Sequence, residues 1–129
     1  EYVRMMRDNS YLSAYQINPA TASTTGWANF RTAVNPCAIG ICAFDPTGGP
    51  TKDQFLPPCS GSCPLYLTNP TDGVYTQQSI GAQTPFTRTI QASPSGANEE
   101  VITSKVTWSF HNAPYTVTVT DHLTPWQSP

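Results

Sequence analysis

Charged side chains are scarce in this chain of 129 residues. Lysine, arginine, aspartate and glutamate together make up 11% of it, against roughly 25% in an average globular protein. The basic residues form no cluster and the formal net charge is −2, so the electrostatic footprint of a nucleic-acid-binding protein is absent. No apolar run approaches the roughly 20 residues that a membrane-spanning helix needs. We therefore expect neither nucleic acid as a partner nor a membrane span within these residues.

The sequence also lacks the common catalytic motifs. It has no G-x-S-x-G nucleophile elbow, no G-x-G-x-x-G and no phosphate-binding loop. Its two histidines, His111 and His122, have no nucleophile context, so we interpret them as surface residues. Glu99 and Glu100 are neighbours at the start of a predicted strand and should point to opposite faces, which makes a carboxylate pair improbable. A structural or binding protein without a cofactor is expected, not an enzyme.

Threonine is the commonest residue, and proline is the next with 13 copies. A surface made polar by threonine, serine and asparagine is typical of extracellular, β-rich proteins. The length suits one domain over residues 1–129. No targeting segment is visible, so we expect a mature or trimmed form of a longer precursor.

The strongest pattern lies in the last third of the chain. Residues 102–110 alternate between apolar and polar side chains, and the alternation resumes after a turn at residues 111–114. One face carries Ile102, Ser104, Val106, Trp108 and Phe110, then Tyr115, Val117 and Val119. This period of two predicts an antiparallel hairpin with one buried face and one wet face. Shorter strands are expected at residues 64–67, 74–76 and 86–91.

Residues 1–16 carry apolar side chains at helical spacing and predict a helix. A helix this short is marginal alone, so it should dock on the apolar face of the sheet. The order is then a helix (1–16), a cysteine-containing loop (17–63) and an antiparallel sheet (64–129), which is an α+β layout. The expected helix–sheet core consists of Val3, Met6, Phe86, Ile90, Ile102, Val106, Trp108, Phe110, Tyr115, Val117 and Val119.

Four cysteines, Cys37, Cys42, Cys59 and Cys63, fall in a region rich in proline, glycine and serine. Their spacing is near that of a zinc ribbon, but both inner spacings exceed the usual C-x2-C. Two disulfides that staple a loop with few apolar residues are the favoured interpretation. The local pairing, Cys37–Cys42 and Cys59–Cys63, is preferred because each bond closes a short loop. A longer-range pairing such as Cys42–Cys59 stays open.

Residues 17–63 otherwise show closely spaced turn signals. Residues 27–34 could form two helical turns with Phe30 and Val34 on one side. Trp27 is the best candidate for an exposed aromatic that contacts a glycan. The loop oxygens of residues 45–49 and 69–73 could hold Ca²⁺, although both segments lack the full D-x-[DN]-x-[DN]-G pattern, so no metal is predicted.

The opening residues, E-Y-V-R-M-M-R-D-N-S-Y-L, resemble a segment of type IV minor pilins of the PilV kind, where E-x-V-R-x-x-R-D-T-N-W-L is common. Tyr11 stands where those proteins have tryptophan, and Asn9 and Ser10 replace threonine and asparagine. Further blocks fit in the same order at residues 65–67, 73–75, 84–90, 106–109 and 117–126, the last reading V-T-V-T-D-H-L-T-P-W. Together these blocks cover about half of the chain. Residues 17–63 match only loosely, through their paired cysteines.

The resemblance implies a pilin-like fold, in which the C-terminal half of a long N-terminal helix packs on a four-stranded antiparallel sheet. It implies a precursor with a cleaved leader and an apolar segment that serves as membrane anchor and filament core. Other pilin or pseudopilin subunits would be the partners. The protein would lie in an extracellular, cell-surface filament after inner-membrane anchoring, and membrane contact would come only through the missing anchor.

Two further functions stay open: a pseudopilin of a type II secretion system, and a secreted adhesin or carbohydrate-binding module that grips a glycan or another surface ligand. We expect these residues by themselves to be monomeric, because the sequence suggests no large exposed apolar patch once the hairpin is covered.

Overall fold

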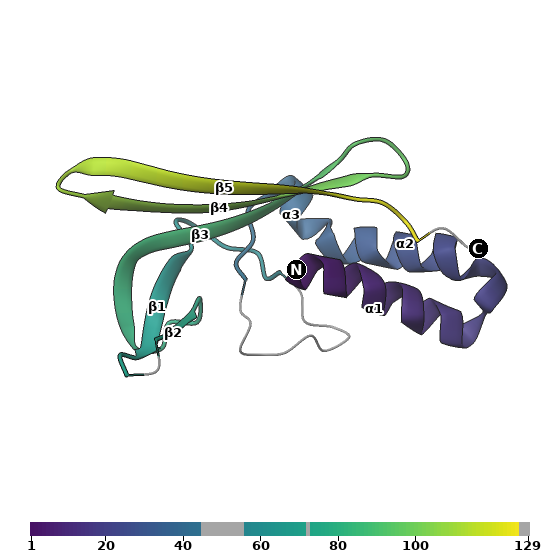
Figure 1. Ribbon diagram of the computed structural model, residues 1–129, viewed down its shortest axis with the longest axis horizontal. Helices are drawn as coiled ribbons and strands as arrows, with labels where there is room; N and C mark the ends of the chain where they lie inside the picture. The colour runs from purple at the N-terminus through teal and green to yellow at the C-terminus, as the bar shows by residue number, and fades with distance from the viewer. Residues whose placement is uncertain (45–55, 72, 127–129) are drawn as a thin grey trace.

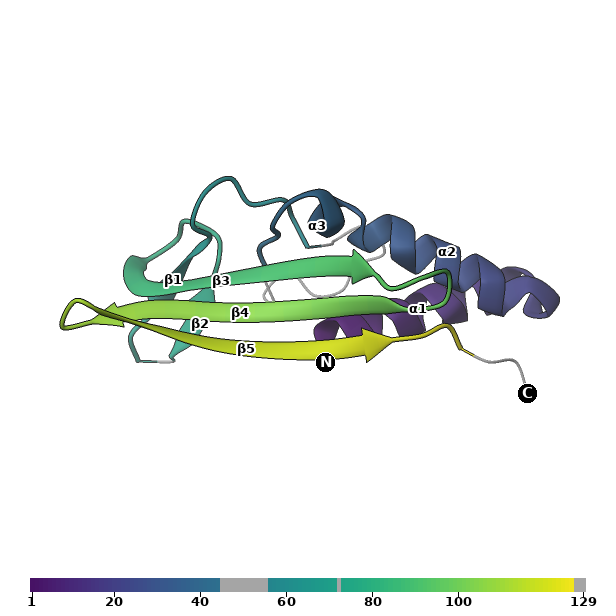
Figure 2. The same ribbon diagram turned by 90° about the horizontal axis from the view of Figure 1, so that it is seen from above.

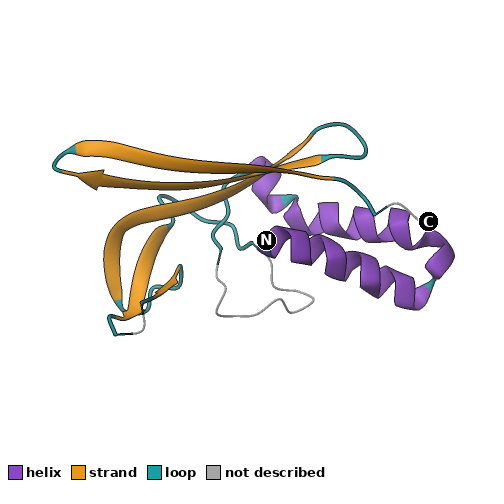
Figure 3. Cartoon of the chain, viewed as in Figure 1, coloured by secondary structure: helices purple, strands orange, loops and turns teal. Residues whose placement is uncertain are grey.

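The computed structural model describes residues 1–44, 56–71 and 73–126. Its elements are α1 (Tyr2–Ile17), η1 (Pro19–Thr21), α2 (Ala22–Val34), α3 (Pro36–Ile39), β1 (Pro64–Asn69), β2 (Val74–Thr76), β3 (Ala82–Pro94), β4 (Glu100–Phe110) and β5 (Ala113–Leu123). Helices and strands are segregated, with the helices at one end of an elongated sheet (Figures 1 and 3). The fold is therefore α+β, with the N-terminal helix and the antiparallel sheet that the sequence predicts. The sheet has five strands rather than four.

The two long helices, α1 and α2, form an antiparallel pair (Figure 1). The chain reverses at Asn18, whose side-chain oxygen accepts a hydrogen bond from the Ala20 backbone N–H at 3.1 Å and so caps the turn η1. Gly26 lies where the helices touch: a Cβ atom at this position would come within 2.7 Å of the Tyr11 Cα. Glycine at this contact lets the two backbones approach closely.

The sheet has the strand order β2-β1-β3-β4-β5, and all its pairs are antiparallel. β4 and β5 pair without interruption from Glu100↔Leu123 to Phe110↔Ala113. His111 and Asn112 form the connecting turn with φ values of 49° and 64°, as a two-residue hairpin turn requires. The predicted hairpin is confirmed, and its register pairs the residues that the sequence places on the same face.

The core lies where the helix pair meets one end of the sheet, at the C-terminal ends of β3 and β5 and the N-terminal end of β4. It contains Met6 from α1, Trp27, Phe30 and Val34 from α2, and Ile90, Ala92, Ile102 and Leu123 from the sheet, together with Cys37, Cys42 and Leu56. Tyr2, Val3, Ala33 and Phe44 pack against it while partly buried. Of the expected core, Met6, Ile90 and Ile102 are buried.

The expectation that the whole apolar face of the hairpin is buried is wrong. The exposed fraction is 60% for Phe110, 45% for Tyr115, 52% for Val117 and 62% for Val119, and Phe86, Val106 and Trp108 are only half-buried. The reason is length: the hairpin extends far beyond the N-terminal end of α1, so the helices cover only the end of the hairpin that lies beside them (Figures 1 and 2), where Glu100, Ile102 and Leu123 are buried. We call these seven residues, Phe86, Val106, Trp108, Phe110, Tyr115, Val117 and Val119, the apolar strip.

The segment expected to be a loop, residues 17–63, contains the helix α2 of 13 residues. The expected helical turns at residues 27–34 form its C-terminal part, with Phe30 and Val34 both fully buried. Two disulfides join Cys37 to Cys42 and Cys59 to Cys63, which is the local connectivity. Cys42 also pairs by its backbone with Ile90 of β3, so the first disulfide anchors α3 to the sheet.

Candidate functional surface

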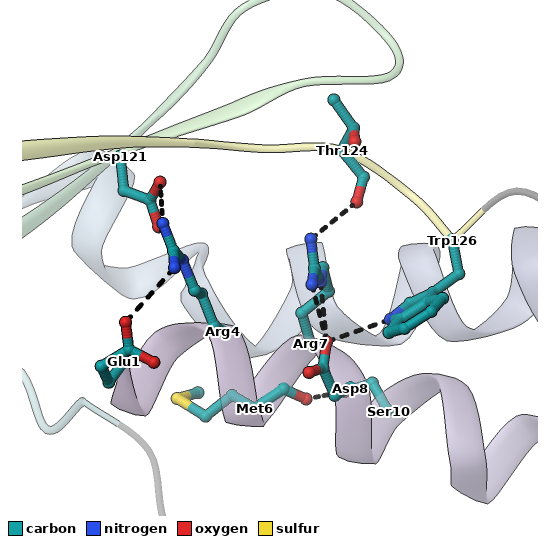
Figure 4. A network of polar contacts seen from close by, with 9 residues as sticks. All are labelled: Glu1, Arg4, Met6, Arg7, Asp8, Ser10, Asp121, Thr124 and Trp126. Atoms are coloured by element: carbon teal, nitrogen blue, oxygen red, sulfur yellow. Dashed lines mark hydrogen bonds and ion pairs between the residues drawn. The ribbon is translucent and has the colours of Figure 1, made fainter.

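Polar contacts clamp α1 to the end of the chain (Figure 4). The Arg4 guanidinium donates two hydrogen bonds to the Asp121 carboxylate, at 2.7 Å from Nε and 3.0 Å from Nη2. A third bond from Arg4 reaches Glu1 at 3.2 Å. This two-pronged contact fixes the first turn of α1 beside the end of β5.

A second set of contacts lies one helical turn further on. Asp8 accepts hydrogen bonds from the Arg7 Nε at 2.9 Å and from the indole Nε1 of Trp126 at 3.0 Å, while Arg7 donates to the Thr124 carbonyl oxygen at 3.4 Å. The Arg7 guanidinium lies 5.5 Å from the centre of the Trp126 ring, and Tyr11 stacks on the same ring at 5.6 Å. The first and last motifs of the resemblance, R-x-x-R-D and D-H-L-T-P-W, therefore contact each other directly.

We call these contacts between α1 and residues 121–126 the clamp. The clamp also changes the pKa of an acidic side chain. The hydrogen bond from Arg4 holds the pKa of the Asp121 carboxyl below its usual range, and the same contact raises the pKa of Arg4. A carboxyl with a lowered folded-state pKa contributes stability above its unfolded pKa and loses it as the pH falls through the folded value.

We expect Arg4→Gln to lower the urea midpoint modestly at neutral pH, because the pair is largely exposed. The difference from the unmodified protein should shrink as the pH falls through the lowered pKa of Asp121, since protonation removes the charge that Arg4 stabilises. Urea titrations from neutral to acidic pH measure this. Asn29→Gln, an exposed polar change on α2, is the control and should leave the pH profile unaltered. A difference that grows toward acidic pH would contradict the assignment.

The apolar strip is built from three adjacent strands. Register places Val106 between Arg88 of β3 and Val117 of β5, and places Trp108 opposite Tyr115. The rings of Trp108 and Tyr115 stack at 5.5 Å with an angle of 13°, and Phe86 lies 5.8 Å from Trp108 on the other side. The strip is thus a row of aromatic and β-branched side chains on the face that the helices cover nearer the core.

The opposite face of these strands is polar. The register aligns Thr87, Thr107 and Thr116 in one row, Thr89, Lys105 and Thr118 in the next, and Gln91, Thr103 and Thr120 in the third. Since no large apolar side chain stands in this array, it suits contact with water. The apolar strip is therefore the side of the distal hairpin that has surface to bury.

A shallow cavity of about 380 Å³ lies between α2, α3 and the sheet. Glu100 lines it, is almost fully buried, and forms an ion pair of 3.3 Å with the Arg31 Nε. Burial raises the pKa of Glu100, while Arg31 opposes that rise. Among the described residues that line the cavity, Glu100 is the only carboxylate, and none is a histidine or cysteine.

The other candidate residues are dispersed. Trp27, expected to be exposed, is instead buried in α2, where its indole N–H donates to the Ala97 carbonyl oxygen at 3.0 Å. His111 and His122 are exposed, and His122 pairs with Glu99 at 2.9 Å. Glu99 and Glu100 contact different partners, His122 and Arg31. A hydrogen bond from Ser95 and that from His122 lower the pKa of Glu99.

Residues 45–49, considered for calcium, lie outside the described residues, as does Asp72 of the second candidate loop. Among the residues that the structure describes, no group of three or more histidine, cysteine, aspartate and glutamate side chains could hold a metal ion. Within the same residues, no helix is both long and apolar enough to cross a membrane.

No family model matches the chain, and no match was found among curated proteins or solved structures.

The sheet is covered by the helices at one end, and its free part is apolar on one face, which suits it to binding. The sequence pattern identifies the residues of the strip but assigns them to the core. It also identifies both motifs of the clamp, but it does not predict that they contact each other.

Proposed function

We propose that this chain is the globular part of a filament subunit of the minor-pilin kind, from a type IV pilus or the related type II secretion system. It would act by packing and surface presentation, without catalysis. The observation that carries the proposal is the position of α1 relative to the sheet. The helix packs against one end of the sheet and starts at the edge of the apolar strip, with Arg4 fixed to Asp121.

A helix that continued α1 beyond Glu1 would run toward the distal part of the hairpin. In both views the hairpin extends past this end of α1 (Figures 1 and 2). Val119, two residues before Asp121 on the same face of β5, would be the first strip residue to be covered. The arrangement suits a subunit whose long N-terminal helix lines the sheet and then enters a filament.

The clamp supports the same proposal. The two motifs on which the resemblance to minor pilins depends, at the beginning and the end of the chain, meet in one network of hydrogen bonds and stacked rings. Their shared purpose would be to fix the helix to the last strand. Such a joint lets tension along a filament helix pass into the sheet.

A secreted binding module is the second candidate, and one observation favours it. The tip of the hairpin exposes aromatic rings, Phe110 and Tyr115, beside the polar residues Ser109 and Asn112. Exposed aromatics next to hydrogen-bonding groups are typical of sites for glycans and for protein partners. An adhesive role at this tip is compatible with a place in a filament.

The coding sequence upstream of Glu1 and the location of the protein test the proposal together. We expect a short leader followed by roughly 25 apolar residues that continue into α1, and recovery of the protein with filaments sheared from cells. A gene encoding a cleavable secretory signal that ends next to Glu1, with the protein free in the medium, would contradict the filament role and favour the binding module.

A further inference from the structure

β5 forms one edge of the sheet, with β4 on one side and no strand on the other among the described residues. Half of the backbone N–H and C=O groups of an edge strand point away from the sheet and can pair with another extended chain. The pairing of β5 with β4 runs through eleven residue pairs without a bulge, so this edge is long and regular.

The edge also lacks the usual protection. Proteins protect exposed edges with lysine, proline, bulges or a covering loop. From Tyr115 to Thr120 the strand carries no charge and no proline, and every side chain in that stretch is exposed. Pro114 and Asp121 flank this uncharged stretch on either side. The Asp121 carboxylate is already neutralised by Arg4.

The side chains of β5 define which strand would fit beside it. The partner needs apolar residues on the face of the apolar strip and small polar residues on the opposite face, over about six uncharged positions. β5 itself has this pattern, Y-T-V-T-V-T. An antiparallel pair centred on Val117 would place Tyr115 opposite Val119 and Thr116 opposite Thr118, so that apolar meets apolar and threonine meets threonine.

We propose that β5 is a self-association edge, at which two copies of the chain pair their β5 strands antiparallel around Val117. The result is a single sheet running through both copies, with a two-fold axis at Val117. The strips of the two copies become neighbours and shield each other along the join. No like charges face each other, since the paired stretch is uncharged. The expectation of a monomer depended on the absence of an exposed apolar patch, and the strip is such a patch.

This inference concerns residues 1–129 alone and does not rest on the filament role. Analytical ultracentrifugation over a concentration series should show a reversible equilibrium between the 14.0 kDa chain and its dimer. Val119→Lys should raise the dimer dissociation constant at least about tenfold, because it places two lysines near the join. Ile17→Lys makes the same kind of change at an exposed end of α1 and should leave the constant unchanged. Circular dichroism checks that both variants are folded.

A cysteine variant separates edge pairing from stacking of the two strips. In the proposed register Val117 faces its own copy, and paired residues in antiparallel strands lie within disulfide range. Val117→Cys should therefore give a disulfide-linked dimer on mild oxidation, while Phe110→Cys, which is at least as exposed on the strip at the hairpin tip, should give no disulfide-linked dimer. A monomer at all concentrations, or equal cross-linking at both positions, would overturn the proposal. Neither result bears on the upstream gene sequence, so the filament role is tested separately.

Discussion

Phe30→Ala is expected to destabilise the protein by about 3–5 kcal/mol, the usual cost of removing a fully buried phenylalanine side chain. Phe30 has no exposed surface and lies in the cluster where α2 meets α1 and the sheet, with its ring 5.4 Å from that of Trp27. The cavity would open where α1, α2 and the sheet meet, and the surrounding elements cannot easily close it. Urea denaturation followed by far-ultraviolet circular dichroism measures the loss.

Trp108→Ala is the matched comparison. Tryptophan is the larger side chain, but Trp108 lies half-buried on the apolar strip, where its ring lies beside those of Phe86 and Tyr115. Its removal leaves no enclosed cavity, so we expect a cost below about 2 kcal/mol. If Trp108→Ala cost as much as Phe30→Ala at low protein concentration, the strip would be covered in solution and the arrangement of helix and hairpin would be different.

The hairpin could be predicted from the sequence because its information is local. A period-2 alternation indicates which side chains share a face, and the register of β4 and β5 agrees with it at every pair. Alternation says nothing about what covers a face. Ile102 and Phe110 lie on the same side of β4, yet Ile102 is buried and Phe110 is mostly exposed, since coverage depends on where α1 begins relative to the sheet.

The helix α2 was underestimated for a related reason. Its N-terminal half, A-S-T-T-G, has weak helix formers, and the signal Asn18-Pro19 before it suggests a break in the chain. In the structure that signal is a capped turn that reverses the chain, and α1 packs along α2 to stabilise it. Tertiary packing overrides low propensity here. A glycine at position 26 also weakens the helical pattern, although the contact with Tyr11 requires it.

The clamp could not be predicted from spacing, because it joins residues separated by more than 100 positions. Arg4 and Asp121 each look like an ordinary surface charge in the sequence. The resemblance singled out both motifs but did not predict that they contact each other. In the structure, the end of β5 lies over the first turns of α1, so the opposite charges at Arg4 and Asp121 meet (Figure 4).

Deleting residues 1–12 should abolish cooperative unfolding. The deletion removes Met6 from the core, Tyr2 and Val3 from its margin, and Arg4 from the clamp. The residues of α1 that are left could form little more than one turn, which is not stable alone. Gly26 of α2, which lies against the backbone of Ser10 and Tyr11, would lose its cover. A broad thermal transition, with binding of a hydrophobic dye before heating, is the expected result.

A pair of point variants shows whether docking of α1, rather than chain length, is responsible. Met6 is buried against the sheet, whereas its neighbour Met5 is more than a third exposed. Met6→Asp places a charge in the core and should destabilise the protein by at least about 3 kcal/mol, approaching the behaviour of the deletion. Met5→Asp makes the same substitution at the neighbouring, exposed position, so it changes composition and helix propensity in the same way as Met6→Asp. It should shift the melting temperature by only a few degrees. Equal melting curves for both variants, or an unchanged curve after the deletion, would mean that α1 is a linker and does not cover the sheet.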